Sequence, residues 1–452
     1  MPIATGAAPS LGTGDAEVEE IVARRAVTPL FQPLVHLSSG ETVGFECLAR
    51  GPEGSSLRAP GTLFAAAAAA ARAGLLGELD WACRAAALGA ARRAALHPSL
   101  TWMVNVDPAS LHRPCPTDLR PVISAAKTRL RVLTELTARG AGERPGELLQ
   151  ATADARQSFW GVALDDVGRA PEPLALLPFL QPDVVKLDLG LLRNRSAVEA
   201  ASVANAVRAY AEATGAVILA EGIEGGDDLE WARDLGATYG QGFHYGHPGP
   251  LPEGLAPPRH PFPFSQRFEI DPSLTPFQTL SASRPIRRAG RRRLTAISRQ
   301  LEAQVLASGD APVVLTSFER PEAYTPDVQQ RLELVTSRAA ITVVAGTGIA
   351  DRVQGPVSAA ELAFDDPAGR EWAVVVAGPT FAAALAATRY DGALPGLTYD
   401  YVLTYDRPAV IAAGRALLQR VTRPRARVTE SLTLESRSSV VPAPIGDHRT
   451  GE

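Results

Sequence analysis

Short apolar runs alternate with helical patterns through the first half of the chain. Two runs, at 31–37 and 42–49, are separated by Ser38-Ser39-Gly40-Glu41, which predicts a β-hairpin. Further strands are expected at 101–106, 130–136, 160–164, 184–187, 217–220 and 238–240, and helices at about 60–73, 78–96, 116–128, 144–158, 196–214 and 227–235. Strands alternating with helices predict parallel βα units, and their number favours a (βα)8-type barrel over a doubly wound open sheet.

The second half begins with a Pro-rich stretch and continues with a shorter alternation. Its pattern predicts an α/β domain, with helices at 291–308, 326–337, 379–388 and 408–420, and strands at 313–318, 341–345, 372–377 and 401–405. We expect five segments: a disordered N-terminus (1–18), the barrel (19–250), a Pro/Arg-rich linker (251–289), the smaller α/β domain (290–422) and a disordered tail (423–452).

Charge and cysteine content narrow the class of protein. The net charge of −4 gives no general attraction to nucleic acid polymers or to membranes, and no apolar run is long enough to span a bilayer. Cys47, Cys83 and Cys115 form no paired motif, which argues against a zinc or disulfide framework. We therefore expect a cytoplasmic protein.

Polar residues stand where the predicted barrel strands end. They are Glu46, Asn105, Glu135, Asp165, Asp166, Lys186, Asp188, Glu221 and Gln241. The ends of barrel strands meet at one face, where active sites are built. One such acid is commonly a helix cap, but clustered carboxylates repel one another unless a cation neutralises them. Oxygen ligands suit Mg²⁺ or Mn²⁺, so the set predicts a metal site.

Lysine is nearly absent from this chain. Of 45 basic residues, only Lys127 and Lys186 are lysines and the rest are arginines. Arginine cannot replace a compact ammonium at every position. Because Lys186 also lies in a predicted strand beside Asp188, we expect it to have a role in the site.

The motifs, in order, resemble the EAL family of cyclic di-GMP phosphodiesterases. The motifs that carry the resemblance are Phe31-Gln32-Pro33-Leu34-Val35, Glu46-Cys47-Leu48-Ala49-Arg50, Met103-Val104-Asn105-Val106, Glu135-Leu136-Thr137, Asp165-Asp166-Val167-Gly168, Val185-Lys186-Leu187-Asp188, Ala220-Glu221-Gly222-Ile223-Glu224 and Gly240-Gln241-Gly242-Phe243. The resemblance covers about 28–250 and implies a barrel whose first strand is antiparallel to the others.

The resemblance also implies roles for individual residues. Two Mg²⁺ or Mn²⁺ ions would be held by Glu46, Asn105, Glu135, Asp165 and Glu221, with Asp166 at the second ion. Lys186, with Glu46 and Asp165, would act in catalysis. The dinucleotide would contact Gln32, Leu48, Arg50 and Gln241, and Glu224 would anchor a loop. The implied reaction gives linear pGpG, and the family resemblance allows a homodimer through the barrel.

Three positions depart from the family pattern. The loop Val167–Pro173 has Val167-Gly168 where the family usually has Phe-Gly, and it lacks the hydroxyl residues that usually follow. Ala138 replaces a Glu, and Cys47 replaces the Ala of the naming motif. These changes in the loop bear on whether a second metal ion is bound and on how fast the dinucleotide is hydrolysed. Two hypotheses follow: a phosphodiesterase of reduced activity, or a cyclic di-GMP receptor that binds without cutting and acts through protein partners. A barrel kept only as an interaction scaffold is a third reading.

The smaller domain resembles the DICT sensory domain of bacterial signalling proteins. The resemblance is carried by Val314-Leu315-Thr316-Ser317-Phe318-Glu319-Arg320, Phe364-Asp365-Asp366-Pro367, Glu371-Trp372-Ala373-Val374-Val375-Val376 and Phe381-Ala382-Ala383-Ala384-Leu385. No metal-ligand cluster or nucleophile–base pair is apparent in this stretch. A sensory domain that regulates the barrel is therefore expected, and its signal is not readable from the sequence.

Overall fold

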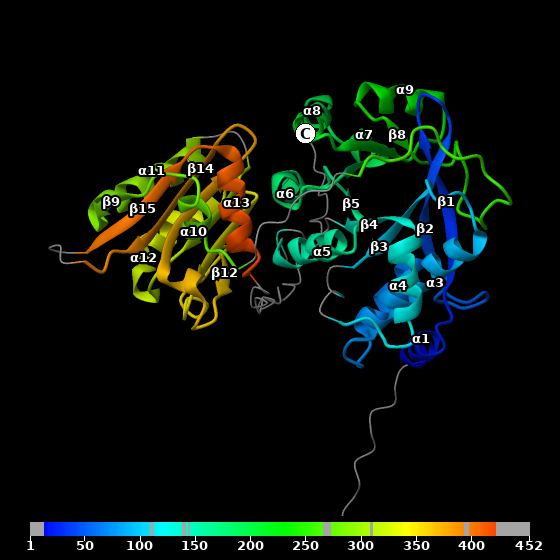
Figure 1. The fold of residues 1–452 in the computed structure, drawn as a ribbon, viewed down its shortest axis with the longest axis horizontal. Helices are drawn as coiled ribbons and strands as arrows, with labels where there is room; N and C mark the ends of the chain where they lie inside the picture. Colours follow the sequence, from blue (N-terminus) through cyan, green and yellow to red (C-terminus); the bar gives the residue numbers. More distant parts are fainter. Residues whose placement is uncertain are drawn as a thin grey trace, which may run out of the picture.

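The computed structural model contains two α/β bodies, a barrel and a separate sheet domain (Figure 1). It describes residues 13–107, 110, 113–137, 142, 145–264, 273–307, 311–392 and 397–421. Most of the predicted disordered N-terminus and the whole predicted tail lie outside the described residues, as does Ala138.

The N-terminal body is a closed barrel of eight strands in sequence order. The strands are β1 (Thr28–His36), β2 (Thr42–Arg50), β3 (Thr101–Val106), β4 (Arg131–Thr137), β5 (Gly161–Asp165), β6 (Val184–Asp188), β7 (Val217–Glu221) and β8 (Tyr239–Gly240). Strand β1 is antiparallel to both β2 and β8, and the remaining neighbours are parallel. The predicted barrel with an antiparallel first strand is confirmed, and the open sheet is excluded.

Nine helices belong to the described part of this body. They are α1 (Thr13–Ala23), α2 (Pro60–Ala69), α3 (Leu75–Ala94), α4 (Arg120–Arg129), α5 (Pro145–Gln157), α6 (Pro171–Leu180), α7 (Leu189–Arg193), α8 (Ala197–Thr214) and α9 (Gly226–Asp234). Helix α1 begins inside the segment that was expected to be disordered. Helix α6 lies where the sequence predicted no helix: it begins at Pro171, where a missing N–H costs nothing, and it also contains Pro178.

The barrel interior has an apolar layer below a polar layer. Side chains two positions apart on a strand point to the same side. Met103, Leu133, Ala163, Val184 and Leu219 are fully buried in one cluster, and each stands two residues before a polar residue of the predicted site. The alternate positions, such as Trp102 and Val104, pack outward in a second cluster with the helices. The alternation thus places the polar residues together at one mouth of the barrel.

A strap at 251–264, within the predicted linker, closes the opposite end of the barrel. Phe262 is 1 % exposed, belongs to the interior apolar cluster and stacks on Tyr239 with ring centroids 4.3 Å apart. The Arg131 guanidinium donates to the Phe262 carbonyl at 2.7 Å and lies over the Phe264 ring. These contacts make the strap part of the barrel's packing.

The C-terminal body is a sheet of seven strands in the order β12-β11-β10-β13-β14-β15-β9. The strands are β9 (Arg287–Gly290), β10 (Val313–Ser317), β11 (Ile341–Gly346), β12 (Ser358–Glu361), β13 (Glu371–Ala377), β14 (Ala382–Arg389) and β15 (Thr398–Thr404). The helices are α10 (Pro276–Ser281), α11 (Arg291–Ala307), α12 (Pro326–Thr336) and α13 (Arg407–Leu418), with 3-10 turns η2 (Pro321–Ala323) and η3 (Pro367–Arg370).

The helix predicted at 379–388 is wrong, because this segment forms strand β14. Its alanines favour a helix by intrinsic propensity. Pairing with β13 on one side and β15 on the other instead buries the segment in the middle of the sheet. Tertiary packing therefore overrides local preference here.

The two bodies touch through helix α13, which packs against α5 and α6 (Figure 1). Glycines allow close approach on both sides. A Cβ at Gly146 would lie 2.2 Å from the Val421 carbonyl oxygen, and one at Gly414 would lie 2.5 Å from the Phe179 ring. Phe179 and Leu417 are fully buried in one continuous apolar cluster.

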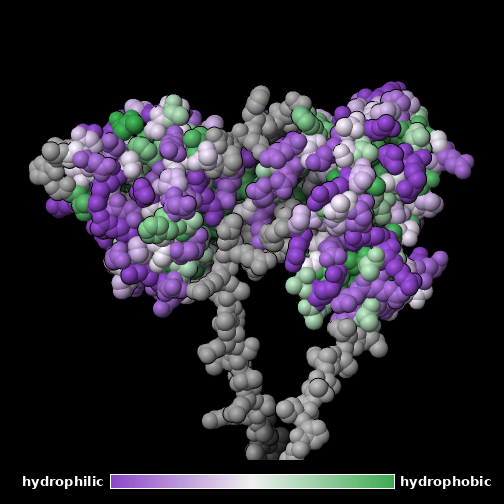
Figure 2. All heavy atoms as spheres, turned by 60° about the horizontal axis from the view of Figure 1, so that its bottom comes forward, coloured by the Kyte–Doolittle hydropathy of each residue, from purple (hydrophilic) through white to green (hydrophobic). Residues whose placement is uncertain are grey.

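Away from this contact, hydrophilic residues cover much of the visible face of both bodies, with hydrophobic residues scattered among them (Figure 2). In the described residues, no helix is both long and apolar enough to cross a membrane.

Candidate active site

One ammonium group stands among four carboxylates at the polar mouth of the barrel. Lys186 Nζ lies 2.7 Å from Glu135 Oε1, 2.8 Å from Glu221 Oε1, 3.7 Å from Glu46 Oε2 and 3.8 Å from Asp165 Oδ1. Lys186 itself is 1 % exposed. The five side chains come from β2, β4, β5, β6 and β7. Strand alternation and parallel register bring them together, as the sequence predicted.

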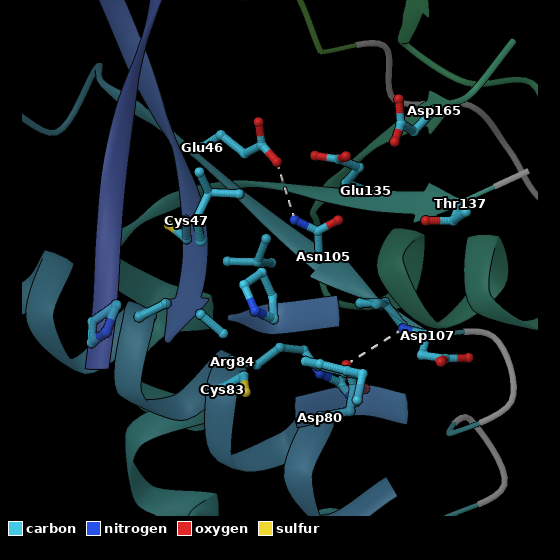
Figure 3. A pocket seen from close by; sticks show the side chains of 18 of the residues that line it. Glu46, Cys47, Asp80, Cys83, Arg84, Asn105, Asp107, Glu135, Thr137 and Asp165 are labelled. Carbon is cyan, nitrogen blue, oxygen red and sulfur yellow. Dashed lines mark hydrogen bonds and ion pairs between the residues drawn. The ribbon is translucent and has the colours of Figure 1, made fainter. Parts of the chain in front are cut away.

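Three side-chain amides connect this cluster to β1, β3 and the segment that follows β8. The Asn105 amide donates to Glu46 Oε1 at 3.3 Å (Figure 3). The Gln241 amide donates to Glu46 Oε2 at 2.6 Å and to Gln32 Oε1 at 2.8 Å, and the Gln32 amide donates to the Gly246 carbonyl at 3.1 Å. Glu46 is thereby held from two sides, and it lies inside β2 rather than at its end.

The cluster carries more negative charge than the protein neutralises. Burial raises the pKa of Glu135 and Glu221 well above their usual values; neighbouring carboxylates add to the effect, and Lys186 opposes it. Burial also works to raise the pKa of Asp165, but Lys186 and local hydrogen bonds outweigh it and the pKa is lowered. Burial works to lower the pKa of Lys186, but the carboxylates outweigh it and raise the pKa well above its usual value. Among the described residues, no second basic side chain pairs with these four acids.

The donor set fits divalent metal ions. All the charged donors are carboxylate oxygens, which Mg²⁺ and Mn²⁺ prefer, and Glu135 Oε2 is buried with no hydrogen-bond partner. As the side chains stand, no three His, Cys, Asp or Glu residues in the described part of the chain are placed to hold an ion. The Lys186 ammonium instead contacts Glu135 and Glu221 at 2.7 and 2.8 Å.

The remaining predicted residues lie at different distances from this cluster. Asp166 is buried, adopts a left-handed backbone with φ of 56° and pairs with Arg169 of the following loop at 3.1 Å. Leu48 and Asp166 line a cavity of about 730 Å³ with the acids, and Glu224 lines a smaller one of about 200 Å³. Arg50 is not among the residues that line either cavity, and its guanidinium donates to the Ala49 carbonyl at 2.8 Å.

The larger cavity extends to residues of α3 that the sequence did not single out. Asp80 and Arg84 form a buried ion pair at 2.6 Å, and the Arg84 guanidinium lies 3.6 Å from the Trp81 ring centroid. Figure 3 shows Asp80, Cys83 and Arg84 on one side of this cavity and Glu46, Glu135 and Asp165 on the other. The sequence does contain one signal for this pair, because Asp80 stands four residues before Arg84 on an Ala-rich helix. That spacing is also typical of a solvated helix face, so it did not single out this pair.

Two family models match the chain. The EAL domain matches residues 15–248, which is more than half of the chain, and the sensory domain found in diguanylate cyclases and two-component systems, abbreviated DICT, matches residues 272–390. Both resemblances drawn from the sequence are thereby confirmed.

Curated relatives and solved structures match mainly the first half. A probable cyclic di-GMP phosphodiesterase of Escherichia coli, PdeB, is 27 % identical over 231 residues, covering 50 % of this chain and 44 % of PdeB. An uncharacterized Sinorhizobium fredii protein, y4lL, is 27 % identical over 230 residues, covering 50 % of this chain and 27 % of that protein. The chain thus spans less than half the length of these two relatives.

Klebsiella pneumoniae BlrP1, solved with manganese and cyclic di-GMP, is 26 % identical with a TM-score of 0.43, covering 50 % of this chain and 56 % of that one. Bacillus subtilis YkuI, solved with cyclic di-GMP and calcium, is 23 % identical with a TM-score of 0.43, covering 52 % and 59 %. Because its family model spans the whole barrel and every strand that carries the carboxylate cluster, the chain belongs to the EAL domain family.

Proposed function

We propose that the barrel hydrolyses cyclic di-GMP to linear pGpG with two Mg²⁺ or Mn²⁺ ions. The observation that carries the proposal is the charge imbalance at the barrel mouth, where four carboxylates face one ammonium. A site that raises the pKa of its own carboxyl groups is suited to a ligand that brings positive charge. Family membership and the relative named as a probable cyclic di-GMP phosphodiesterase support the choice of substrate.

Each residue has a distinct part in this proposal. Glu46, Asn105, Glu135, Asp165 and Glu221 would hold the metals, with Asp166 at the second. Bound ions would supply Lewis-acid polarisation of the phosphodiester and a water of lowered pKa. Lys186 would supply a compact positive charge that stabilises the charge developing on the phosphoryl oxygens. Gln241 orients Glu46 by its 2.6 Å hydrogen bond. Gln32, Leu48 and Arg50 would contact the dinucleotide, and Glu224 would anchor the neighbouring loop.

The test is an assay of the full chain with cyclic di-GMP and Mn²⁺, beside a binding titration in Ca²⁺. Ca²⁺ accepts oxygen ligands but is a weaker Lewis acid, so it separates binding from cutting. We expect binding in Ca²⁺ and slow conversion to the linear product in Mn²⁺. Absence of both binding and conversion would overturn the proposal.

A receptor without turnover is the second candidate function, acting through protein partners. The pairing of Arg169 with Asp166 favours it, because this arginine lies in the altered loop and occupies the carboxylate assigned to the second metal. Binding in Ca²⁺ with no conversion in Mn²⁺ would establish this function instead.

Regulation by the C-terminal domain is part of the proposal. Helix α13 packs on α5 and α6, which follow β4 and β5, the strands that carry Glu135 and Asp165. We expect Gly146→Ala to separate this contact and to change the rate, because its Cβ would meet the Val421 carbonyl oxygen. Gly226→Ala in α9, where a Cβ meets no atom within 4 Å, is the matched control. Equal rates in the two variants and the native chain would remove the support for coupling.

The proposal also includes a homodimer and a cytoplasmic location. A homodimer through the barrel would have to use helices other than α5 and α6, since α13 covers both. The three cysteines are free, which agrees with a reducing cytoplasm. The input to the C-terminal domain is unassigned. We propose that the strap at 251–264 belongs with the catalytic domain, which the sequence predicted as 19–250. We also propose that α10 and β9 belong with the sensory domain, which the sequence predicted as 290–422.

A further inference from the structure

The outermost strand of the C-terminal sheet leaves one edge unpaired. Strand β9 is the last strand of the sheet, pairs only with β15 among the described residues, and lies on the side of its domain away from the barrel (Figure 1). The Arg291 amide donates to the Leu397 carbonyl at 3.2 Å, and hydrogen-bonded pairs alternate along antiparallel strands. The N–H and C=O groups of Arg288 and Gly290 therefore point outward from the sheet.

This edge carries positive charge that the described chain neutralises only in part. Six arginines lie between residues 284 and 293. Two of them form ion pairs, Arg284 with Asp406 and Arg288 with Asp400. Three others are exposed and form no ion pair or side-chain hydrogen bond with the described residues; they are Arg287, Arg292 and Arg293.

These three arginines gain nothing from their position in the chain. Arg292 and Arg293 stand in the first turn of α11, which contains no acid, and a cation there faces the positive end of the helix dipole. Arg287 lies on the same side of the sheet as α11, because Ala289, two residues further along β9, packs in one apolar cluster with Leu294. Charges that oppose their own helix indicate a surface with a function outside the fold.

Charged residues on a sheet edge can serve only to prevent edge-to-edge pairing. Pairing between two copies of β9 would set arginine against arginine, and like charges directly opposite are destabilising. A second copy of this chain is therefore a poor partner for this edge. An acidic strand would be attracted at the same positions, and the exposed side chains of Ile286 and Leu397, beside the two ends of β9, offer it apolar contacts.

We propose that β9 binds an extended acidic segment of a partner protein, which adds to the seven-stranded sheet along this edge. The outward groups of Arg288 and Gly290 would form main-chain hydrogen bonds, and Arg287, Arg292 and Arg293 would contact carboxylates. A phosphate polymer or a lipid headgroup offers acceptors but no N–H donor for the two outward carbonyls, so a peptide fits this edge better. The surface takes no part in the proposed hydrolysis, and the two proposals stand or fall separately.

The test uses the full chain and a fluorescent synthetic peptide of alternating glutamate and valine, with affinity measured by fluorescence anisotropy. A peptide with lysine in place of glutamate tests the charge. A glutamate–valine peptide methylated at every amide nitrogen keeps the charge but cannot donate main-chain hydrogen bonds. A single-stranded oligonucleotide of equal charge tests whether any polyanion suffices.

We expect the glutamate peptide to bind at least about tenfold more tightly than the lysine and methylated peptides, and less tightly as salt is raised. Arg287→Glu and Arg292→Glu should each weaken binding about three- to tenfold. Arg292→Glu should not lower Tm, because an acid suits the first turn of a helix, so its loss of binding would not come from unfolding. Arg338→Glu, at an exposed position after α12, is the matched control.

Four outcomes would overturn the proposal. The first is no saturable binding of the glutamate peptide by the native chain. The second is equal binding of the methylated peptide, which would mean contact by charge alone, without strand addition. The third is unchanged affinity in Arg287→Glu and Arg292→Glu. The fourth is tighter binding of the oligonucleotide than of the peptide, lost in Arg292→Glu, which would assign the surface to nucleic acid.

Discussion

The carboxylate cluster at the barrel mouth and the buried acids of the C-terminal domain are balanced in opposite ways. In the C-terminal domain each buried acid has its own donor: Glu302 pairs with Arg331 at 2.6 Å, and Glu371 accepts from the Thr275 hydroxyl and the Phe277 amide. In the barrel, four acids share Lys186. A structural acid is satisfied within the chain, whereas an unbalanced group of acids indicates a site completed by something from outside.

Removing an acid from the unbalanced cluster should have the largest effect on activity. Glu46→Ala takes away a carboxylate that Asn105 and Gln241 orient. We expect hydrolysis of cyclic di-GMP in Mn²⁺ to fall by more than about 10²-fold, because even residues that only orient metal ligands cost about 10- to 100-fold. Glu41→Ala is the matched control, since Glu41 lies on the same hairpin but pairs with Arg259. Equal activity of both variants would contradict the site assignment.

Changing the shape of the central cation should have the next largest effect. Lys186→Arg keeps the charge but introduces a wider planar group into a fully buried position. We expect kcat to fall by about 10- to 100-fold, the size of effect that a misplaced group produces. Lys127→Arg, at the exposed end of α4, should leave kcat unchanged. Normal turnover of Lys186→Arg would mean that only its charge matters.

Releasing Asp166 from its loop partner should have a smaller effect, and in the opposite direction. Arg169→Ser removes an ion pair whose arginine side chain is 44 % exposed. Such pairs contribute up to about 1 kcal/mol, so we expect a roughly two- to fivefold rise in kcat in Mn²⁺. Arg92→Ser, an exposed change on α3, serves as the control. An unchanged or lower rate would show that this pair does not limit turnover.

A change at a buried acid of the C-terminal domain should alter the stability of the protein and leave the rate of hydrolysis almost unchanged. Burial raises the pKa of Glu371 from 4.5 to about 7. The folded state therefore binds this proton more tightly than the unfolded state, so stability is greatest below pH 4.5 and falls as the pH rises to about 7. Glu371→Gln, which stays neutral, should raise the free energy of unfolding at pH 8 by roughly 1–3 kcal/mol and change it little at pH 4.5.

Urea unfolding of the native chain and Glu371→Gln at the two pH values measures the difference. Asp365→Asn, at an exposed position of the same domain, is the matched control. A Glu371→Gln variant less stable than the native chain at pH 8 would mean that the ionised carboxylate is the favoured form in the folded protein.

The same contrast explains what the sequence could predict. Strand alternation located Asn105, Glu135 and Glu221 because local period and barrel topology agree. Strand β14 was missed because its alanines favour a helix until β13 and β15 pair with it. The position of Lys186 between the acids, and the arrival of Arg84 at the cavity wall, depend on contacts between segments distant in the chain. No local pattern encodes such contacts.

The strap that carries Phe262 also limits where the barrel can be joined to a different C-terminal domain. The EAL match ends at residue 248, but Phe262, which closes the end of the barrel opposite the carboxylate cluster, lies beyond it in the sequence. A fusion that joined the barrel to another domain at residue 248 would lack the strap, and the apolar side chains inside the barrel would be exposed at that end. A chain in which the C-terminal domain is exchanged for another would therefore have to keep residues through about 264 with the barrel, so the unit that folds is longer than the residues matched by the EAL family model.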